Sequence, residues 1–193
     1  MKSNIKLGLI HSTIREDEKL IIREAEKKKI QLSLMDARYQ IFNPNKWGKN
    51  FGVILDRCLS TTVGFQATLF FEKLGIIVVN SSLVSQNCDN KFLTSLILNQ
   101  HKIPTVPFAL VFTEKEAKEA IEQLGGYPVV IKPVSGSWGR LLAKVNDEDS
   151  LEGIIEQKQV LGSPIQKALF IQKYVKKPGR DIRAVVINNK TIC

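Results

Sequence analysis

The sequence has few of the residues that build metal sites and disulfide frameworks. Its three cysteines lie far apart, and its two histidines stand alone. No Cys/His cluster has the spacing of a zinc site, and three scattered cysteines do not suggest a disulfide framework. We therefore expect reduced thiols at Cys58, Cys88 and Cys193, and nothing near them supports a nucleophilic role.

Long apolar runs and targeting signals are also missing. No apolar run approaches the roughly 20 residues that a membrane-spanning helix needs. The first residues have a short apolar core but no small-residue cleavage pattern, so they do not resemble a signal peptide. We therefore expect no membrane partner and a cytoplasmic location. The chain also lacks a GxGxxG pattern, so dinucleotide binding has no support.

Acidic residues are fewer than basic ones, 19 against 28, which gives a net charge of +9. A lysine-rich surface explains this excess, and so does an acidic partner such as a nucleotide, a nucleic acid or an acidic protein. Nucleic acid is the weakest of these partners, because the chain has no arginine-rich tract and no aromatic-interleaved RNA-binding signature. With 193 residues, 44% of them hydrophobic, the chain can form one large or two small globular domains.

The first 80 residues alternate between predicted strands and helices. Thr13 and Glu16 have the spacing of a capping box, which predicts a helix from there to about Lys29. The alternation predicts a small α/β domain with a mostly parallel sheet. The strands are expected at 5–10, 30–35, 51–55 and 76–79, and the second helix at 62–74.

Asp56 and Arg57 follow a predicted strand at its carboxyl end, where open α/β sheets place ligands. The favoured interpretation of these two residues is a local ion pair. Further on, the polar segment 80–87 predicts a domain boundary near residue 84.

The second half has a different order of elements, which predicts an α+β unit with an antiparallel sheet. A helix capped by Asn87 or Asp89 is expected over 88–101, and a second helix follows a capping-box spacing at Thr113 and Glu116. The remaining elements are strands at 108–112, 129–131, 169–175 and 181–187, a strand that ends at Val145, and a helix at 147–158 capped by Asn146.

The stretch from Val129 to Val145 reads VVIKPVSGSWGRLLAKV. Its two apolar runs suit strands, and the loop SGSWG is rich in residues that let backbone N–H groups converge on an anion. Lys132 lies where the first strand enters this loop, as in many phosphate sites. The loop is not a Walker A loop, and a plain hairpin with a solvated lysine fits the same residues.

Lys91 lies in the first turn of a predicted helix, where the helix dipole disfavours a cation but favours an anion. A lysine at this place makes sense if it shares a bound anion. A solvated lysine is the simpler alternative.

Four motifs in this order resemble the ATP-grasp ligases, and within them the RimK-like branch. They are LDRC (55–58), CDNK (88–91), KPVSGSWGRLLAKV (132–145) and IQKYVKKPGRDIR (171–183). Within that branch they are most similar to LysX-type ligases. The resemblance covers the whole chain. It implies a pre-ATP-grasp α/β domain over 1–84 and an ATP-grasp region over 85–193, with a central subdomain at about 106–175 and its C-terminal part missing.

The resemblance also implies an ATP site. Lys91 and Lys132 would bind the phosphates, and the loop from Gly136 would close over them. The strand after Ile171 would hold adenine through backbone groups of Lys173 and Val175, and Asp181 would lie at the ribose, supported by Arg183. The implied ATP-binding residues are Lys91, Lys132, Gly136, Ser137, Trp138, Gly139, Arg140, Leu141, Leu142, Gln172, Lys173, Tyr174, Val175, Asp181 and Arg183, with hydroxyl donors from Ser135 and Ser137.

The activity implied by this resemblance is the ATP-dependent formation of an amide through an acyl phosphate. Glutamate or α-aminoadipate would be joined through its α-amino group to the C-terminal glutamate of LysW, a small acidic carrier protein, in lysine or arginine biosynthesis. No residue of the chain is expected to act as a covalent catalyst. The Mg²⁺ ligands are expected beyond Cys193, so we expect this chain to be inactive by itself. Homo-oligomers are common in the branch.

Two alternatives share the nucleotide site. One is a RimK-like ligase that adds glutamate to a ribosomal protein or a coenzyme. The other is a nucleotide-binding module without catalysis. The identity of the acceptor separates the first alternative from the LysX-type reaction, and an absence of turnover would indicate the second.

Overall fold

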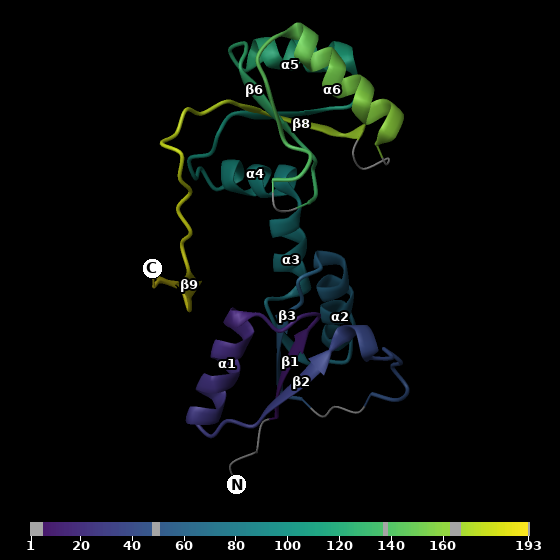
Figure 1. Ribbon diagram of the computed structural model, residues 1–193, viewed down its shortest axis with the longest axis vertical. Coiled ribbons are helices and arrows are strands. Elements are labelled where there is room, and N and C mark those ends of the chain that lie inside the picture. The colour runs from purple at the N-terminus through teal and green to yellow at the C-terminus, as the bar shows by residue number, and fades with distance from the viewer. Residues whose placement is uncertain (1–5, 48–50, 137–138, 163–166, 193) are drawn as a thin grey trace. The chain divides into compact units, whose positions relative to one another are not determined.

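The computed structural model describes residues 6–47, 51–136, 139–162 and 167–192 (Figure 1). The contacts between residues divide the chain into two compact units. The first contains residues 1–97 together with 135–137, and the second contains 98–134 and 138–193. Each unit has its own sheet and its own apolar core.

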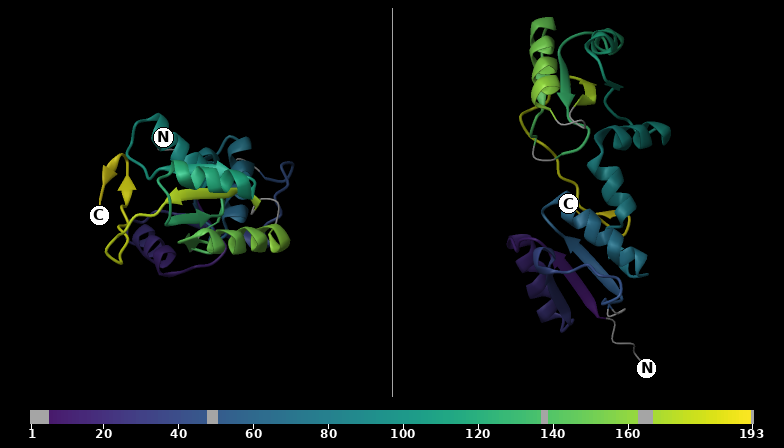
Figure 2. Two further views of the ribbon diagram at one scale, coloured as in Figure 1. Left: turned by 90° about the horizontal axis from the view of Figure 1, so that it is seen from above. Right: turned by 90° about the vertical axis from the view of Figure 1, so that its right-hand side faces the viewer.

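The first unit contains a parallel sheet with the strand order β2-β1-β3-β4, as the sequence predicts. Helix α1 covers one face of this sheet and helix α2 the other (Figure 2). The strands are β1 (Leu7–His11), β2 (Leu32–Asp36), β3 (Val53–Arg57) and β4 (Ile77–Val79), and the helical segments are α1 (Glu16–Lys27), η1 (Ala37–Tyr39), α2 (Thr61–Lys73) and α3 (Ser82–Asp89).

The core of the first unit lies between the sheet and α2. Ile10 and Ile54 from adjacent strands pack with Phe71 of α2, and all three side chains are fully buried. The Trp47 ring packs edge-to-face against the Phe71 ring, with the ring centroids 5.2 Å apart. Burial of such a side chain contributes about 1.5 to 3 kcal/mol to the free energy of folding. These contacts therefore hold α2 against the sheet.

Two predicted helix starts and one predicted connection of this region are wrong. Helix α1 begins at Glu16 with Arg15 at its N-cap, because Glu18 and not Glu16 accepts from the free backbone N–H there. The segment 80–87, predicted as a polar connection, largely forms α3, since the Ser81 hydroxyl accepts from Val84 N. The next helix, α4 (Lys91–Gln100), is capped by Asn90, whose side chain accepts from Leu93 N at 2.9 Å.

The second unit contains an antiparallel sheet with the strand order β5-β8-β6-β7, again as predicted. Helices α5 and α6 lie over one face, where their apolar side chains bury Val129, Ile131 and Ile171 (Figures 1 and 2). The elements are β5 (Phe108–Val111), α5 (Glu114–Gln123), β6 (Val129–Lys132), β7 (Ala143–Val145), α6 (Glu148–Leu161) and β8 (Leu169–Lys173).

The caps of this unit are close to their predicted places. The Thr113 hydroxyl accepts from Glu116 N and opens α5. The N-cap of α6 is Asp147 and not Asn146, because the Asp147 carboxylate accepts from Ser150 N at 2.8 Å. The Ser150 hydroxyl in turn donates to the Asp147 carbonyl oxygen. Gly125 and Gly126 end the α5 region with positive φ angles of 93° and 80°, which glycine adopts without strain.

The predicted strand at 181–187 is mostly wrong. Only Val186 and Ile187 form a strand, β9, which pairs with β10 (Lys190–Thr191) in a short hairpin. The side chains from Val175 to Ile192 are exposed. The strand propensity of these residues was not enough to form a longer strand. An extended segment also needs a neighbouring strand to bond with and an apolar surface to pack against.

The described residues contain no helix that is long and apolar enough to cross a membrane.

Candidate functional site

Lys132 and Gln172 form a hydrogen-bonded pair in the second unit. Lys132 ends β6 and Gln172 lies on β8, its antiparallel neighbour, diagonally across the ladder. The Lys132 Nζ donates to the Gln172 Oε1 at 2.6 Å. Two paired strands therefore hold the ammonium in a fixed place at the entrance to the glycine-containing loop.

This pair lies on the face of the sheet that α5 and α6 do not cover. Side chains alternate along a strand, so Val130 and Lys132 point away from the buried Val129 and Ile131. Lys144 of β7 pairs with Val130 and shares the same face. The face opposite α5 and α6 thus carries two lysines and an amide beside apolar side chains, among them the buried Phe170 opposite Lys132, an arrangement that suits an anion with a flat apolar part.

The end of β8 presents backbone groups beside this face. The backbone N–H of Lys173 donates to Pro107 O at 3.0 Å, and that of Tyr174 donates to Pro128 O at 3.3 Å. The Lys144 Nζ lies over the Tyr174 ring, 4.4 Å from its centroid. Val175 N makes no backbone hydrogen bond to another described residue. The Lys173 N–H is thus already used within the protein.

The loop between β6 and β7 contributes Gly139 to Leu142 in an exposed turn. Gly139 and Leu141 have φ angles of 66° and 58°. The second is unusual for a residue with a branched side chain and marks a locally strained backbone. Predicted site residues Ser137 and Trp138 lie outside the described residues.

Lys91 and Gly136, both predicted for the phosphates, are brought together in the first unit. The Lys91 Nζ donates to the Gly136 carbonyl oxygen at 2.5 Å. Next to it, the Ser135 hydroxyl donates to the Asp89 carboxylate. Lys91 is the first residue of α4, and the Asn90 side chain next to it caps this helix start by accepting from Leu93 N.

Asp181 and Arg183 do not lie on a strand face as predicted, because their segment is exposed and unpaired. Asp181 forms an ion pair with Lys177, which lowers the pKa of the Asp181 carboxyl below its usual value. Both side chains of the pair are more than half exposed, so the bond is weak. The roles predicted for Asp181 and Arg183 at the ribose therefore stay predictions.

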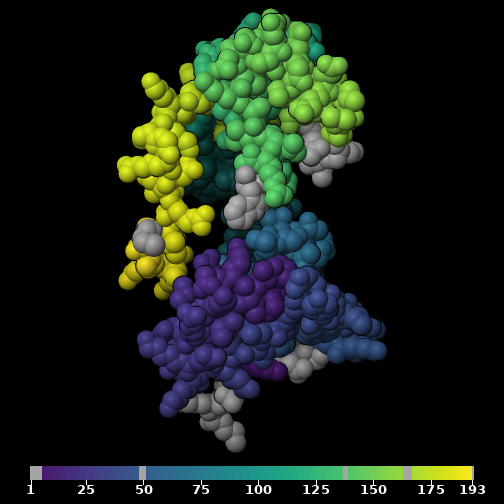
Figure 3. Space-filling view, viewed as in Figure 1, coloured from purple at the N-terminus to yellow at the C-terminus, as the bar shows by residue number. Residues whose placement is uncertain are grey.

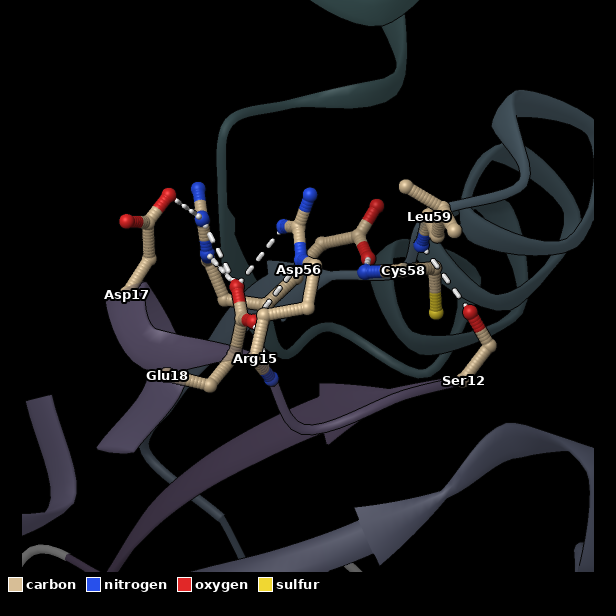
Figure 4. A network of polar contacts seen from close by, with 8 residues as sticks. Ser12, Arg15, Asp17, Glu18, Asp56, Cys58 and Leu59 are labelled. Atoms are coloured by element: carbon tan, nitrogen blue, oxygen red, sulfur yellow. Dashed lines mark hydrogen bonds and ion pairs between the residues drawn. The ribbon is translucent and has the colours of Figure 1, made fainter.

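Asp56 and Arg57 do lie at the carboxyl end of β3, but the ion pair predicted between them is wrong (Figure 4). The Asp56 carboxylate accepts from Cys58 N at 2.8 Å. Arg57 reaches α1, where it donates from Nε to Glu18 Oε1 at 2.9 Å and contacts Asp17. Successive side chains of a strand point to opposite faces, so the neighbouring charges cannot meet.

Glu18 is the residue that the sequence analysis missed. Its side chain is fully buried, and its carboxylate accepts from Arg15 N, from Arg15 Nε and Nη2, and from Arg57. The hydrogen bonds from Arg15 lower the pKa of the Glu18 carboxyl to about 2. A signal was present, because Glu18 shares the helical stripe of Ile14, Ile21 and Ala25, where an acid is out of place.

A cavity of about 640 Å³ lies in the first unit beside the end of β3 and the start of α2. Burial raises the pKa of the Cys58 thiol at its wall to about 12, so this thiol is a poor nucleophile. Cys58 and Cys88 are free, as predicted, and Cys193 lies outside the described residues. The lining includes Asp56, Ser60, Thr61, Asn80, Cys88, Asp89, Ser135 and Gly136.

The described residues do not fit a metal ion. No group of three or more His, Cys, Asp or Glu side chains among them is placed to hold one. The described residues therefore supply no metal ligand set.

Two family models match nearly the whole chain. Residues 7–86 match the LysX preATP-grasp domain, and residues 88–193 match the RimK-like ATP-grasp domain. The two matches meet at residues 86–88, between the boundary near residue 84 that the sequence predicts and the division of contacts after residue 97.

Relatives and solved structures agree with these matches. The α-aminoadipate–LysW ligase LysX of Sulfurisphaera tokodaii is 33% identical over 95% of this chain and 66% of its own length. The glutamate–LysW ligase ArgX of the same organism is 30% identical over 97% and 66%. A RimK domain protein of Sphaerobacter thermophilus has the same fold, with a TM-score of 0.76 and 24% identity over 89% of this chain and 64% of that one. The chain thus spans about two thirds of the length of these proteins.

Proposed function

The chain belongs to the RimK-like ATP-grasp family, and from this premise we propose that it binds ATP on the face of its antiparallel sheet that lies opposite α5 and α6. The observation that carries the proposal is the Lys132–Gln172 pair, 2.6 Å apart, at the entrance to the glycine-containing loop. A lysine held by two paired strands supplies a fixed positive charge for a phosphate, with little motion to lose on binding.

Each part of the site has a distinct role in this proposal. Lys132 and Lys91 neutralise phosphate oxygens, and the loop from Gly136 to Leu142 closes over them. The Lys173 carbonyl and the Val175 N–H bind the adenine edge, which lies against the apolar side chains of the sheet. Asp181 contacts the ribose, and Arg183 supports it.

The whole protein, we propose, is a carboxylate–amine ligase. The γ-phosphoryl group of ATP passes to the C-terminal carboxylate of a small acidic carrier protein, which gives ADP and an acyl phosphate. The α-amino group of glutamate or α-aminoadipate then attacks the acyl carbon, and phosphate leaves as the amide forms. Positioning and charge neutralisation drive such transfers, so no protein nucleophile is required. The net charge of +9 supports an acidic partner.

The nucleotide site is tested by isothermal titration of this chain with ATP. We expect Lys132→Ala to weaken ATP binding by about ten-fold or more, since a charge-assisted phosphate contact contributes about 1.5 to 3 kcal/mol. Lys115→Ala on the exposed face of α5 is the matched control and should bind ATP like the original chain. Equal affinity of the two variants would refute the role of Lys132.

The ligase reaction is tested with a polypeptide that contains this sequence at the full length of its relatives. ADP release and the mass of the carrier protein are measured with ATP, carrier and either glutamate or α-aminoadipate. We expect ADP only when carrier and amino acid are both present, together with a carrier heavier by one amino-acid residue. Turnover with a ribosomal protein or coenzyme in place of the carrier would favour the first alternative function, and ATP binding without turnover would favour a non-catalytic module.

A further inference from the structure

Lys144, the middle residue of β7, is an exposed lysine on the sheet face opposite α5 and α6. Its Nζ lies over the Tyr174 ring, 4.4 Å from the ring centroid. No acidic side chain among the described residues forms an ion pair with it. A cation over an aromatic ring at the surface is held more weakly than a cation that is hydrogen-bonded to a phosphate. The ring is therefore a partner that a phosphate displaces.

The register of the sheet places this contact above β6. Lys144 pairs with Val130 from one side of β6. Tyr174 follows β8 on the other side, where its backbone N–H donates to Pro128 O. Neighbouring strands lie about 4.8 Å apart, so two long side chains that approach from the two sides meet over β6. The contact thus lies over the part of the sheet that carries Val130, one of the apolar side chains against which we place adenine.

The charges of the second unit are divided between the two faces of its sheet. Of the ten acidic residues from 98 to 193, four lie on α5, four on α6 and one, Asp147, at the N-cap of α6. The surface of α6 is visible in yellow-green in the space-filling view (Figure 3). The tenth is Asp181 in the exposed segment after β8, and the four strands contain no acidic residue. The opposite face therefore offers Lys132 and Lys144 to an anion without a carboxylate from any of these strands, which favours a ligand with several negative charges.

We infer that Lys144 is a further phosphate ligand of the proposed nucleotide site, beside Lys132 and Lys91. On binding, its ammonium leaves the Tyr174 ring and pairs with the phosphate next to the ribose. Lys132 lies two residues, or about 7 Å, nearer to the loop than Val130, the strand partner of Lys144. Lys132 is therefore placed toward the outer phosphates and Lys144 toward the adenine end. The inference rests on the proposed function, since it needs a nucleotide on this face.

A simpler role for Lys144 is to cover the sheet. The aliphatic stem of a lysine packs on apolar surface while its ammonium stays in water. In that case Lys144 would stay over the Tyr174 ring with or without a nucleotide, and the loss of its charge would not change nucleotide affinity. The two roles predict different results in the experiments that follow.

Calorimetry with AMP tests the contact, because AMP carries only the phosphate next to the ribose. Adenosine is the same ligand without that phosphate. We expect Lys144→Met to weaken AMP binding about ten-fold and adenosine binding less than about two-fold. Lys144→Arg keeps the positive charge and should restore most of the AMP affinity. Lys115→Met, on the exposed face of α5, is the matched control and should bind AMP like the original chain.

Nuclear magnetic resonance follows the Lys144 side chain itself. Its ε-methylene signal is identified by its loss in Lys144→Met. In the chain without nucleotide this signal should be displaced from those of solvated lysines, because the Tyr174 ring shields nearby protons. AMP should return it saturably to the position of solvated lysines, whereas the Lys115 signal should not move. A Lys144 signal that AMP leaves in place would overturn the inference.

The results also separate this inference from the proposed function. Equal AMP affinity of Lys144→Met and the original chain, together with weaker ATP binding by Lys132→Ala, would overturn the role of Lys144 and leave the proposed site intact. Failure of the original chain to bind either nucleotide would overturn both. Lys144 is exposed, so its variants are expected to fold, and Lys144→Gln is a second neutral variant if Lys144→Met aggregates.

Discussion

Glu18 in the first unit and Lys158 in the second are both charged side chains buried on helices, but their surroundings differ. The Glu18 carboxylate accepts hydrogen bonds from two arginines and one backbone N–H. The Lys158 ammonium has no hydrogen-bond partner among the described residues. The two pKa shifts follow: pairing stabilises the charged form of Glu18, and desolvation destabilises that of Lys158.

The comparison separates a buried charge that joins two elements from a buried charge that has no hydrogen-bond partner among the described residues. The Glu18 carboxylate joins the start of α1 to the end of β3, so its bonds fix the carboxyl edge of the parallel sheet (Figure 4). The Lys158 ammonium makes no hydrogen bond to a described residue, so the burial of its charge costs stability.

The largest effect is expected when the Glu18 charge is removed. Glu18→Gln keeps the size of the side chain but leaves Arg15 and Arg57 without their carboxylate, so we expect a loss of about 2 kcal/mol in the free energy of unfolding at pH 7. Chemical denaturation measures it. Glu16→Gln, an exposed ion-pair partner in the same turn, is the control and should cost less than about 0.5 kcal/mol.

The stability of Glu18→Gln at low pH distinguishes the loss of the Glu18 charge from a change in packing. The pKa of the folded Glu18 carboxyl is about 2, below its usual value of 4.5. A lowered folded pKa gives stability that is present above pH 4.5 and is lost as the pH falls toward 2. The difference between the original chain and Glu18→Gln should therefore shrink over that range. A difference that stays constant would mean that the variant acts through packing.

Much of the fold can be predicted from the sequence, because periodicity and caps are local signals. The alternation over the first 80 residues predicts the parallel sheet, and the two apolar runs around Lys132 predict the β6–β7 hairpin. The predictions fail where the structure of a segment depends on pairing with a distant part of the chain. Val185 to Ile187 have strand-forming side chains, but only the last two find a ladder.

The candidate site follows the same rule. Lys132 is marked by its place before a glycine-containing loop, but its bond to Gln172 depends on the register between two strands 40 residues apart. The sequence predicts Asp56 as the partner of Arg57, since nothing local points to Glu18, 39 residues away. Lys158 carries no sequence signal, because a lysine in the last turn of a helix is common at the surface.

A smaller effect of opposite sign is expected when the buried Lys158 charge is removed. Lys158→Met replaces an unpartnered buried ammonium by an apolar side chain of similar length, so we expect the free energy of unfolding to rise by about 1 kcal/mol at pH 7. Lys115→Met, at a side chain that is 80% exposed, should change it by less than about 0.5 kcal/mol. Denaturant midpoints of the three proteins at equal slope measure both changes.

The pH dependence of this gain tests its cause. The pKa of Lys158 is lowered from 10.5 by burial, so between the folded and unfolded pKa values the unfolded chain binds more protons. Stability of the original chain therefore rises with pH over that interval, while Lys158→Met lacks this contribution. The advantage of the variant should shrink as the pH approaches 10.5. An advantage that is absent at pH 7, or that grows with pH, would show that Lys158 has an acceptor in solution, and the contrast with Glu18 would then be lost.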